Sequence, residues 1–213
     1  MGRPWMYLLV LVPVVTDVIE TGGWPARPRE WFTEVSVGLL IAVLVRRILR
    51  ERQALEALAR VDALTGLGNR RAFEEALAEE CARARRLPHP LTLVNVDLDH
   101  FKRVNDGAGH EAGDRVLRQL ADAVRQVVRV NFDRGFRLGG DEFALLLPGS
   151  SLAQAEAVLA RIRQACAQAD PLWRDGPLGL SAGVAELGDR ESARDFMRRA
   201  DEAMYRQKTA RRG

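Results

Sequence analysis

Residues 137–143 have the sequence RLGGDEF and lie where two short apolar runs, 132–138 and 143–147, meet. This pattern predicts a β-hairpin with Gly139 and Gly140 in its turn, because glycine reaches positive φ without a steric penalty. Two glycines also let a bulky ligand approach the backbone, and the adjacent carboxylates of Asp141 and Glu142 are more than a turn requires. Taken alone, the stretch is compatible with a solvated hairpin tip and with a ligand-binding loop.

A second acidic cluster, Asp97-Leu98-Asp99, ends the apolar run 91–97, which predicts a central strand. A strand end and a hairpin tip can be neighbours in one sheet, so Asp97, Asp141 and Glu142 together predict a site for divalent cations such as Mg²⁺. Two metals that bridge an attacking oxygen and a phosphate are a common device for nucleotidyl transfer. Asp99 either joins this site or caps the helix that follows.

The order of the remaining elements predicts an α+β fold. We expect strands at 91–97 and 178–185 besides the hairpin, and helices at 72–86, 101–104, 115–129, 152–169 and 192–208. Residues 105–114 are predicted as a polar connection, and 171–177 as a loop rich in breakers. This order favours a ferredoxin-like antiparallel sheet, with helices mostly on one face.

The first 45 residues have the pattern of a membrane anchor. Residues 5–16 and 35–45 carry no charge, and three tryptophans lie at the edges of these runs. We expect transmembrane helices at about 4–19 and 31–49, joined by a short external loop, with the arginines of 46–52 placing both ends in the cytoplasm. Each charge-free core is shorter than the roughly 20 residues of a spanning helix, and a cleaved signal peptide is the alternative for the first run.

Residues 46–63 continue as a charged helix with apolar positions, either a solvated linker or a short coiled stalk that holds two copies together. The basic clusters are not interleaved with aromatic residues, so we expect no nucleic-acid partner. Cys81 and Cys166 lack metal-ligand spacing and are predicted to be buried, reduced thiols.

Polar residues after Asp97 are candidates for nucleotide binding. A buried Asp114 would accept from N1–H and the 2-amino group of guanine, neither of which adenine offers, and Asn105 could donate an amide to the same base. Lys102, Lys208 and Arg212 are candidate cations for phosphates. The same residues also fit ordinary helix ends and solvated surface positions.

Five segments in one order resemble the GGDEF, or diguanylate cyclase, domain family over residues 60–213. These segments are 62–71 (DALTGLGNRR), 97–102 (DLDHFK), 104–114 (VNDGAGHEAGD), 137–143 (RLGGDEF) and 200–212 (ADEAMYRQKTARR). The resemblance implies the palm fold of nucleotide cyclases and the condensation of two GTP molecules into cyclic di-GMP and two pyrophosphates. In this reaction a 3′-hydroxyl attacks an α-phosphate across a homodimer of half-sites.

The resemblance also implies a role for individual residues. Two Mg²⁺ ions per GTP, or Mn²⁺ in their place, would be held by Asp97, the Leu98 carbonyl, Asp141 and Glu142, and Asp141 would assist deprotonation of the 3′-hydroxyl. The implied substrate contacts are Phe101, Lys102, Asn105, His110, Asp114, Gly139, Gly140, Lys208 and Arg212. The expected organisation is a membrane anchor at 1–45, a stalk at 46–63 and a catalytic domain at 60–213, on the cytoplasmic side of the bacterial inner membrane.

The chain departs from the family pattern at three places. Gly68 stands where proline is usual, and the last helix has Ala210 and Arg211 before Arg212, where the family has glycine before the arginine. Many members carry an Arg-x-x-Asp site for product inhibition ahead of the hairpin, whereas here Asp133 follows Arg129 by four residues, so we expect weak or absent feedback. A catalytically inactive module that binds GTP or cyclic di-GMP is the alternative function, and the intact turn and aspartates argue against it.

Overall fold

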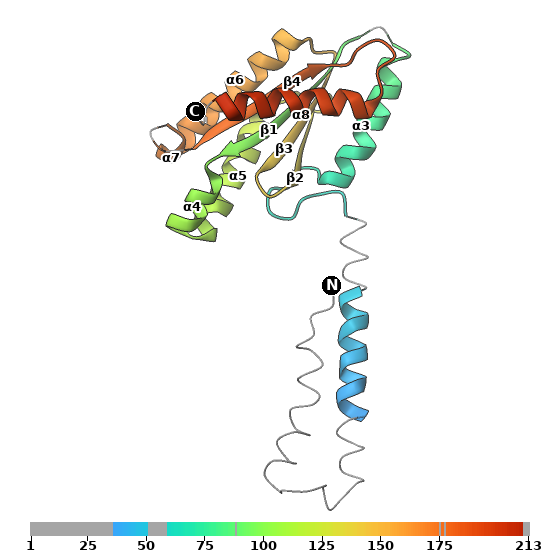
Figure 1. The fold of residues 1–213 in the computed structure, drawn as a ribbon, viewed down its shortest axis with the longest axis vertical. Helices are drawn as coiled ribbons and strands as arrows, with labels where there is room; N and C mark the ends of the chain where they lie inside the picture. The colour runs from blue at the N-terminus through green and yellow to red at the C-terminus, as the bar shows by residue number, and fades with distance from the viewer. Residues whose placement is uncertain (1–35, 51–58, 88, 175, 177, 211–213) are drawn as a thin grey trace, which may run out of the picture. The chain divides into compact units, whose positions relative to one another are not determined.

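The protein is described by a computed structural model over residues 36–50, 59–87, 89–174, 176 and 178–210 (Figure 1). The chain divides into two compact units, Met1–Leu58 and Ala59–Gly213. In the first unit residues 36–50 are helical, with exposed apolar side chains such as Leu39 and Ile41. The predicted span at 4–19 lies outside the described residues, and the span at 31–49 is described only from residue 36. Within the described segments, no helix combines the length and the apolar character that crossing a membrane requires.

The prediction of a helix over residues 46–63 is wrong for its last five residues. Residues 46–50 are helical and 51–58 lie outside the described residues, but 59–63 are not helical. Asp62 instead accepts hydrogen bonds from the backbone N and the hydroxyl of Thr65, at 2.9 and 2.5 Å, and so forms a tight turn. Val61 forms a β-bridge with Gly68 across this turn. The short side chain of Asp62 stabilises the turn better than it would a helix interior.

The second unit is an α+β domain built on one antiparallel sheet. The elements are α3 (Arg70–Ala84), β1 (Leu91–Asp99), α4 (Phe101–Ala108), α5 (His110–Val127), β2 (Arg134–Gly139), β3 (Glu142–Pro148), α6 (Leu152–Ala169), α7 (Pro171–Arg174), β4 (Gly179–Glu186) and α8 (Ala193–Ala210). The four strands lie in the order β2-β3-β1-β4, and every pair is antiparallel. The predicted α+β class with an antiparallel sheet flanked by helices is therefore confirmed.

Helices cover both faces of the sheet, which corrects the expectation of helices mostly on one face. All nine residues of β1 are buried, so both of its faces need a cover. Val94 and Val96 pack in one hydrophobic core with residues of α5 and α6. Leu93 points to the opposite face and packs in a second core with residues of α3 and α8. In Figure 1, α8 runs across this second face.

Local sequence signals explain where helices α3 and α6 begin. Asn69 caps α3 by accepting from Ala72 N, and Ser151 begins α6 with a capping box that involves Gln154. The predicted connection at 105–114 is instead mostly helical, with only Gly109 between α4 and α5. Few side chains of residues 105–114 are buried, so the sequence there is polar and lacks the apolar periodicity that predicts a helix. Within the expected loop at 171–177, residues 171–174 form the short helix α7.

The two cysteines are free and buried, as predicted. Burial raises the pKa of the Cys166 thiol to about 12, and it raises the pKa of Cys81 as well. Both groups are therefore protonated and unreactive at neutral pH.

Candidate active site

The end of β1 and the tip of the β2–β3 hairpin lie side by side. Asp97 is directly opposite Glu142 in the register of β1 and β3, and Leu98 N donates to the Asp141 carbonyl at 3.3 Å. Asp97 is buried, with 6% of its surface exposed. The structure thus brings together the two acidic clusters, which are more than 40 residues apart in the sequence.

The hairpin tip requires glycine for its backbone conformation. Gly139 has φ of +141° and Gly140 has φ of +54°, which residues with a Cβ rarely adopt. A Cβ added at either position would meet nothing within 4 Å. The tip therefore combines an unusual backbone with open space around it.

Arg137 fixes the tip from inside the hairpin. Its Nε and Nη2 donate to the Gly140 carbonyl at 3.0 and 2.8 Å, and its Nη1 donates to Asp62 Oδ1 at 3.1 Å. Burial tends to raise the pKa of Asp62, but the hydrogen bonds from Thr65 and from Arg137 outweigh it, and the pKa is lowered. The sequence did not predict the contact between Arg137 and Asp62, because no local pattern in either segment indicates a partner 75 residues away.

Lys208 lies on the carboxylate of Asp97. Its Nζ is 2.6 Å from both Oδ1 and Oδ2, so residues predicted for phosphate and for metal are in direct contact. Burial raises the pKa of Asp97, the hydrogen bond from Lys208 opposes this rise, and the charge of Asp141 adds to it. Burial therefore makes the ionised form of Asp97 less favourable, and a cation beside the carboxylate offsets this cost.

The donor set fits a hard divalent cation, although the side chains are not gathered around one point. Among the residues that the structure describes, no three His, Cys, Asp or Glu side chains form a group that could hold a metal. Glu142 points to Arg70 at 3.4 Å, and Asp99 accepts from the Ser181 hydroxyl at 2.6 Å. The side chains at this end of the sheet offer oxygen donors, which are the ligands that Mg²⁺ prefers. The ammonium of Lys208 lies against Asp97, which shows that a positive charge fits beside this carboxylate.

The predicted nucleotide-binding residues lie on α4 and α5. Asn105 and Phe101 of α4 pack against Gly113 of α5, where an added Cβ would lie 2.0 Å from Asn105 Oδ1 and 3.1 Å from Phe101 Cζ. Asp114 follows this contact, and its side chain is 46% exposed and 3.6 Å from Arg118. The expectation of a buried Asp114 is therefore not met in this state. Lys102 and His110 are exposed, and Arg212 lies outside the described residues.

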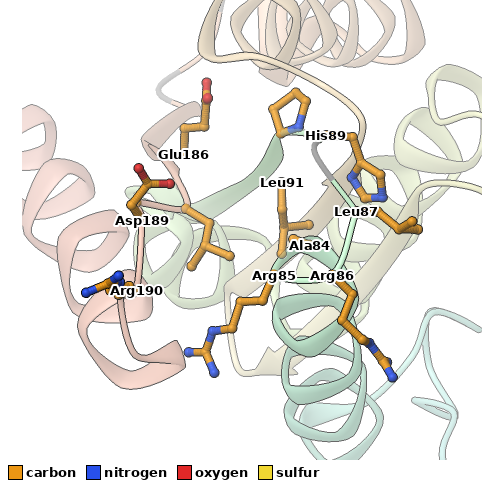
Figure 2. Close-up of a pocket in the computed structure, with 12 residues that line it drawn as sticks. Ala84, Arg85, Arg86, Leu87, His89, Leu91, Glu186, Asp189 and Arg190 are labelled. Atoms are coloured by element: carbon orange, nitrogen blue, oxygen red, sulfur yellow. The ribbon is translucent and has the colours of Figure 1, made fainter.

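Neither of two cavities formed by the described residues contains the whole predicted site. A cavity of about 780 Å³ lies at the opposite end of the sheet, beside the start of β1 and the end of β4 (Figure 2). Arg85, His89 and Asp189 are among its lining residues, and no predicted site residue is. A cavity of about 400 Å³ lies between α3, α8 and the sheet, and Glu142 lines it. We therefore place the chemistry at the strand end, where the acids and Lys208 meet.

The segment ahead of the hairpin, where we expect weak or absent product feedback, is closed by an ion pair between Arg129 and Asp133. Asp133 Oδ2 accepts from the backbone N and the Nε of Arg129, at 2.8 and 3.0 Å, and Oδ1 accepts from its Nη2 at 2.6 Å. The Asp133 side chain is 1% exposed. Both carboxylate oxygens are thus occupied by the residue one position ahead of the family's arginine.

Residues 59–213 match the family model described as "Diguanylate cyclase, GGDEF domain". This match covers the whole second unit of the structure. It includes the hairpin tip, the acids of β1 and helix α8.

Related proteins agree with this match. The chain is 42% identical over 154 residues to the diguanylate cyclase DgcP of Pseudomonas aeruginosa, covering 71% of this chain and 23% of that protein. It is 32% identical over 172 residues to the diguanylate cyclase DgcS of Shewanella oneidensis, covering 81% of this chain and 56% of that protein. The chain thus spans 23% of the length of the first relative and 56% of the length of the second.

A solved structure gives the same result for the fold. The GGDEF domain of DgcB from Caulobacter crescentus, crystallised in complex with cyclic di-GMP, superposes with a TM-score of 0.66 at 34% identity. The comparison covers 71% of this chain and 91% of that one.

Proposed function

Since the chain belongs to the GGDEF domain family of diguanylate cyclases, we propose that it condenses two GTP molecules into cyclic di-GMP with release of two pyrophosphates. The observation that carries this proposal is the meeting of Asp97 and Asp141 at one end of the sheet, with Lys208 on the first of them. Nucleotidyl transfer from a triphosphate uses acidic side chains to hold metal ions and a cation to stabilise the charge that develops on the phosphates.

The acidic end of the sheet is where we place the metal. Asp97, the Leu98 carbonyl, Asp141 and Glu142 would hold two Mg²⁺ ions, with Mn²⁺ as a substitute. When bound, these ions neutralise phosphate charge and lower the pKa of an attacking hydroxyl. The raised pKa of Asp97 supports this assignment, because burial disfavours the charged carboxylate and a bound cation would offset that cost.

The side chains then have separate tasks in the reaction. Asp141 takes the proton from the 3′-hydroxyl, the freed oxygen bonds to the α-phosphorus of the second GTP, and the bond from that phosphorus to the bridging oxygen breaks. Pyrophosphate leaves, and the same exchange in the opposite direction closes the ring. Lys208, together with Lys102, Phe101 and Arg212, binds the phosphates, and the positive charges stabilise the negative charge that develops on transfer.

The junction of α4 and α5 is the proposed guanine site. Asp114 accepts from N1–H and the 2-amino group, while Asn105 and His110 complete the contacts to the nucleotide. The 3.6 Å pair with Arg118 leaves Asp114 half exposed, so its carboxylate is accessible to a base that enters from solvent. Adenine would leave this carboxylate without a donor, which favours GTP over ATP.

Each domain holds one GTP, so the reaction needs two domains that face one another. The open space above Gly139 and Gly140 supports this arrangement, because a second nucleotide can approach the backbone there. We propose that residues 46–63 hold two copies together and that residues 1–45 anchor the chain in the bacterial inner membrane with the catalytic domain in the cytoplasm. The apolar, exposed side chains of 36–49 support the anchor.

The test is synthesis by the full chain in lipid nanodiscs, supplied with GTP and Mg²⁺ and analysed for cyclic di-GMP. We expect product with GTP, none with ATP alone, and loss of synthesis when the metal is chelated. Asp141→Ala should abolish synthesis, whereas Asp189→Ala, at the opposite end of the sheet, should leave it unchanged. Equal synthesis by Asp141→Ala would remove the role given to this residue.

The alternative is a catalytically inactive module that binds GTP or cyclic di-GMP and acts through partners. It predicts nucleotide binding by calorimetry without pyrophosphate release, under conditions in which the protein is dimeric. The oxygen donors and Lys208 at one strand end favour the enzyme, because binding alone does not need them together.

A further inference from the structure

The last three turns of α8 contact the sheet through polar side chains and through the close approach of Met204 to Gly183 of β4. Phe196 and Ala200, in the first half of the helix, are buried in the core. Among the described residues of α8 after Ala200, none is buried. Lys208 lies in this second half, so packing in the core does not determine where its ammonium is held.

Gln207, the residue before Lys208, is bound to the outer edge of the sheet. β4 is an edge strand, and its Ala182 N donates to Gln207 Oε1 at 2.5 Å. The same oxygen accepts from Arg163 Nη2 of α6 at 3.4 Å, and this guanidinium also donates to the Leu180 carbonyl at 3.2 Å. One amide oxygen thus connects α8, β4 and a helix from the opposite face of the sheet.

The two neighbouring residues of α8 reach neighbouring places on two strands. Gln207 binds Ala182 of β4, which is opposite Val96 of β1, and Lys208 binds Asp97, the next residue of β1. A shift of α8 along or across the sheet would therefore break both contacts. The contact of Gln207 with β4 therefore bears on where the Lys208 ammonium lies against Asp97.

We propose that Gln207 is a positioning residue that keeps the Lys208 ammonium at the catalytic end of β1 by binding the edge of β4. This inference rests on the proposed function, because it assigns Gln207 to the same reaction. Gln207 touches neither substrate nor the reacting atoms. It acts through Lys208 alone.

The test is a double-mutant cycle on kcat/KM for GTP in the full chain. Gln207→Met keeps the size of the side chain and removes the acceptor, and we expect it to lower kcat/KM about tenfold or more, because small displacements of a positioned group are costly. In a Lys208→Met background the same change should alter the remaining kcat/KM less than about twofold. Such non-additivity is the sign of two residues that act as one unit.

Two further variants separate positioning from folding. Gln207→Glu keeps an oxygen that accepts from Ala182 N and Arg163, and it should stay within about threefold of the unaltered chain. Thr209→Ala, which removes a hydroxyl bound to the Tyr205 carbonyl of the same helix, should leave activity unchanged. If Gln207→Met fails to fold, Gln207→Ala, with the best helix former, repeats the cycle.

The outcomes distinguish the two claims. Additive losses in the cycle, or no rescue by Gln207→Glu, overturn the positioning role while the proposed function stands. No cyclic di-GMP from the unaltered chain overturns the proposed function, and the positioning role with it.

Discussion

Arg137 and Asp62 join the catalytic hairpin to the turn at which the domain begins. The guanidinium of Arg137 binds Asp62 on one side and the Gly140 carbonyl on the other, and only 13% of its side chain is exposed. The hairpin tip therefore has a direct polar connection to the non-helical end of the segment 46–63 that we propose as the stalk. A displacement of this turn changes the position of the glycines that border the active site.

Asp62→Asn tests this connection. The change keeps the shape and removes the charge that Arg137 faces, so we expect a loss of about 1–3 kcal/mol in the free energy of unfolding and a lower kcat. The pKa of Asp62 is below its usual 3.8, so its contribution is present above pH 3.8 and is lost as the pH falls through the lowered pKa. Denaturant melts of the unaltered chain and of the variant, taken over a descending series of pH values, should therefore converge as the pH falls below the lowered pKa.

Asp97→Asn should separate activity from stability. The pKa of this acid is raised, so its ionisation disfavours the folded state as the pH rises through the raised value, and the cost remains at neutral pH. The amide removes that cost, and we expect loss of synthesis without a lower melting temperature at pH 7. A marked fall in melting temperature would instead give Asp97 a structural role through Lys208.

Gly183→Ala should displace α8. A Cβ at this position of β4 would lie 1.9 Å from the Ala200 carbonyl oxygen and 2.3 Å from Met204 N, and neither backbone group can give way alone. We expect a loss of about 1–3 kcal/mol in the free energy of unfolding, together with reduced synthesis.

Gly107→Ala is the matched control for that variant. Gly107 lies within α4, and an added Cβ would meet nothing within 4 Å. Because alanine favours a helix, this variant should gain up to about 1 kcal/mol. Thermal unfolding of both variants checks the pair, and a loss of stability in both would mean that crowding by α8 is not the cause.

Product feedback should be weak or absent. Both oxygens of Asp133 are bound by Arg129, and a ligand would have to displace that guanidinium from a buried carboxylate. Initial rates measured with added cyclic di-GMP, with a nucleotide-free buffer as control, should stay unchanged. Inhibition at low micromolar product, abolished in Asp133→Ala, would show that the ion pair opens to admit a ligand.

The sequence predicted the sheet well because strand signals here are strong. The apolar run at 91–97 and the glycine pair at 139–140 determine a central strand and a hairpin, and their acids meet as expected. The helices between them were predicted less well. Residues 105–114 are polar because α4 and α5 expose most of this junction, so hydrophobic periodicity gave no sign of the helix.

The contacts that organise the site were beyond sequence reasoning. Lys208 and Asp97 are 111 residues apart, and Gln207 and Ala182 meet only because α8 reaches the edge of β4. Such pairs depend on how two elements cross, and no local pattern records that angle. The two glycines could be assigned to the turn because they are a local signal. The contact of Arg137 with Asp62 joins distant segments and could not be predicted in this way.

The glycines of the hairpin tip have a consequence for chirality. Gly140 has φ of +54°, which a residue of the D configuration prefers and a residue of the L configuration rarely adopts. A chain assembled by ligation with D-alanine at this position should therefore fold and close its turn with less loss of backbone freedom, whereas L-alanine should strain it. The tip would thus distinguish two mirror-image residues of the same size, and that difference would report on the backbone conformation of the tip.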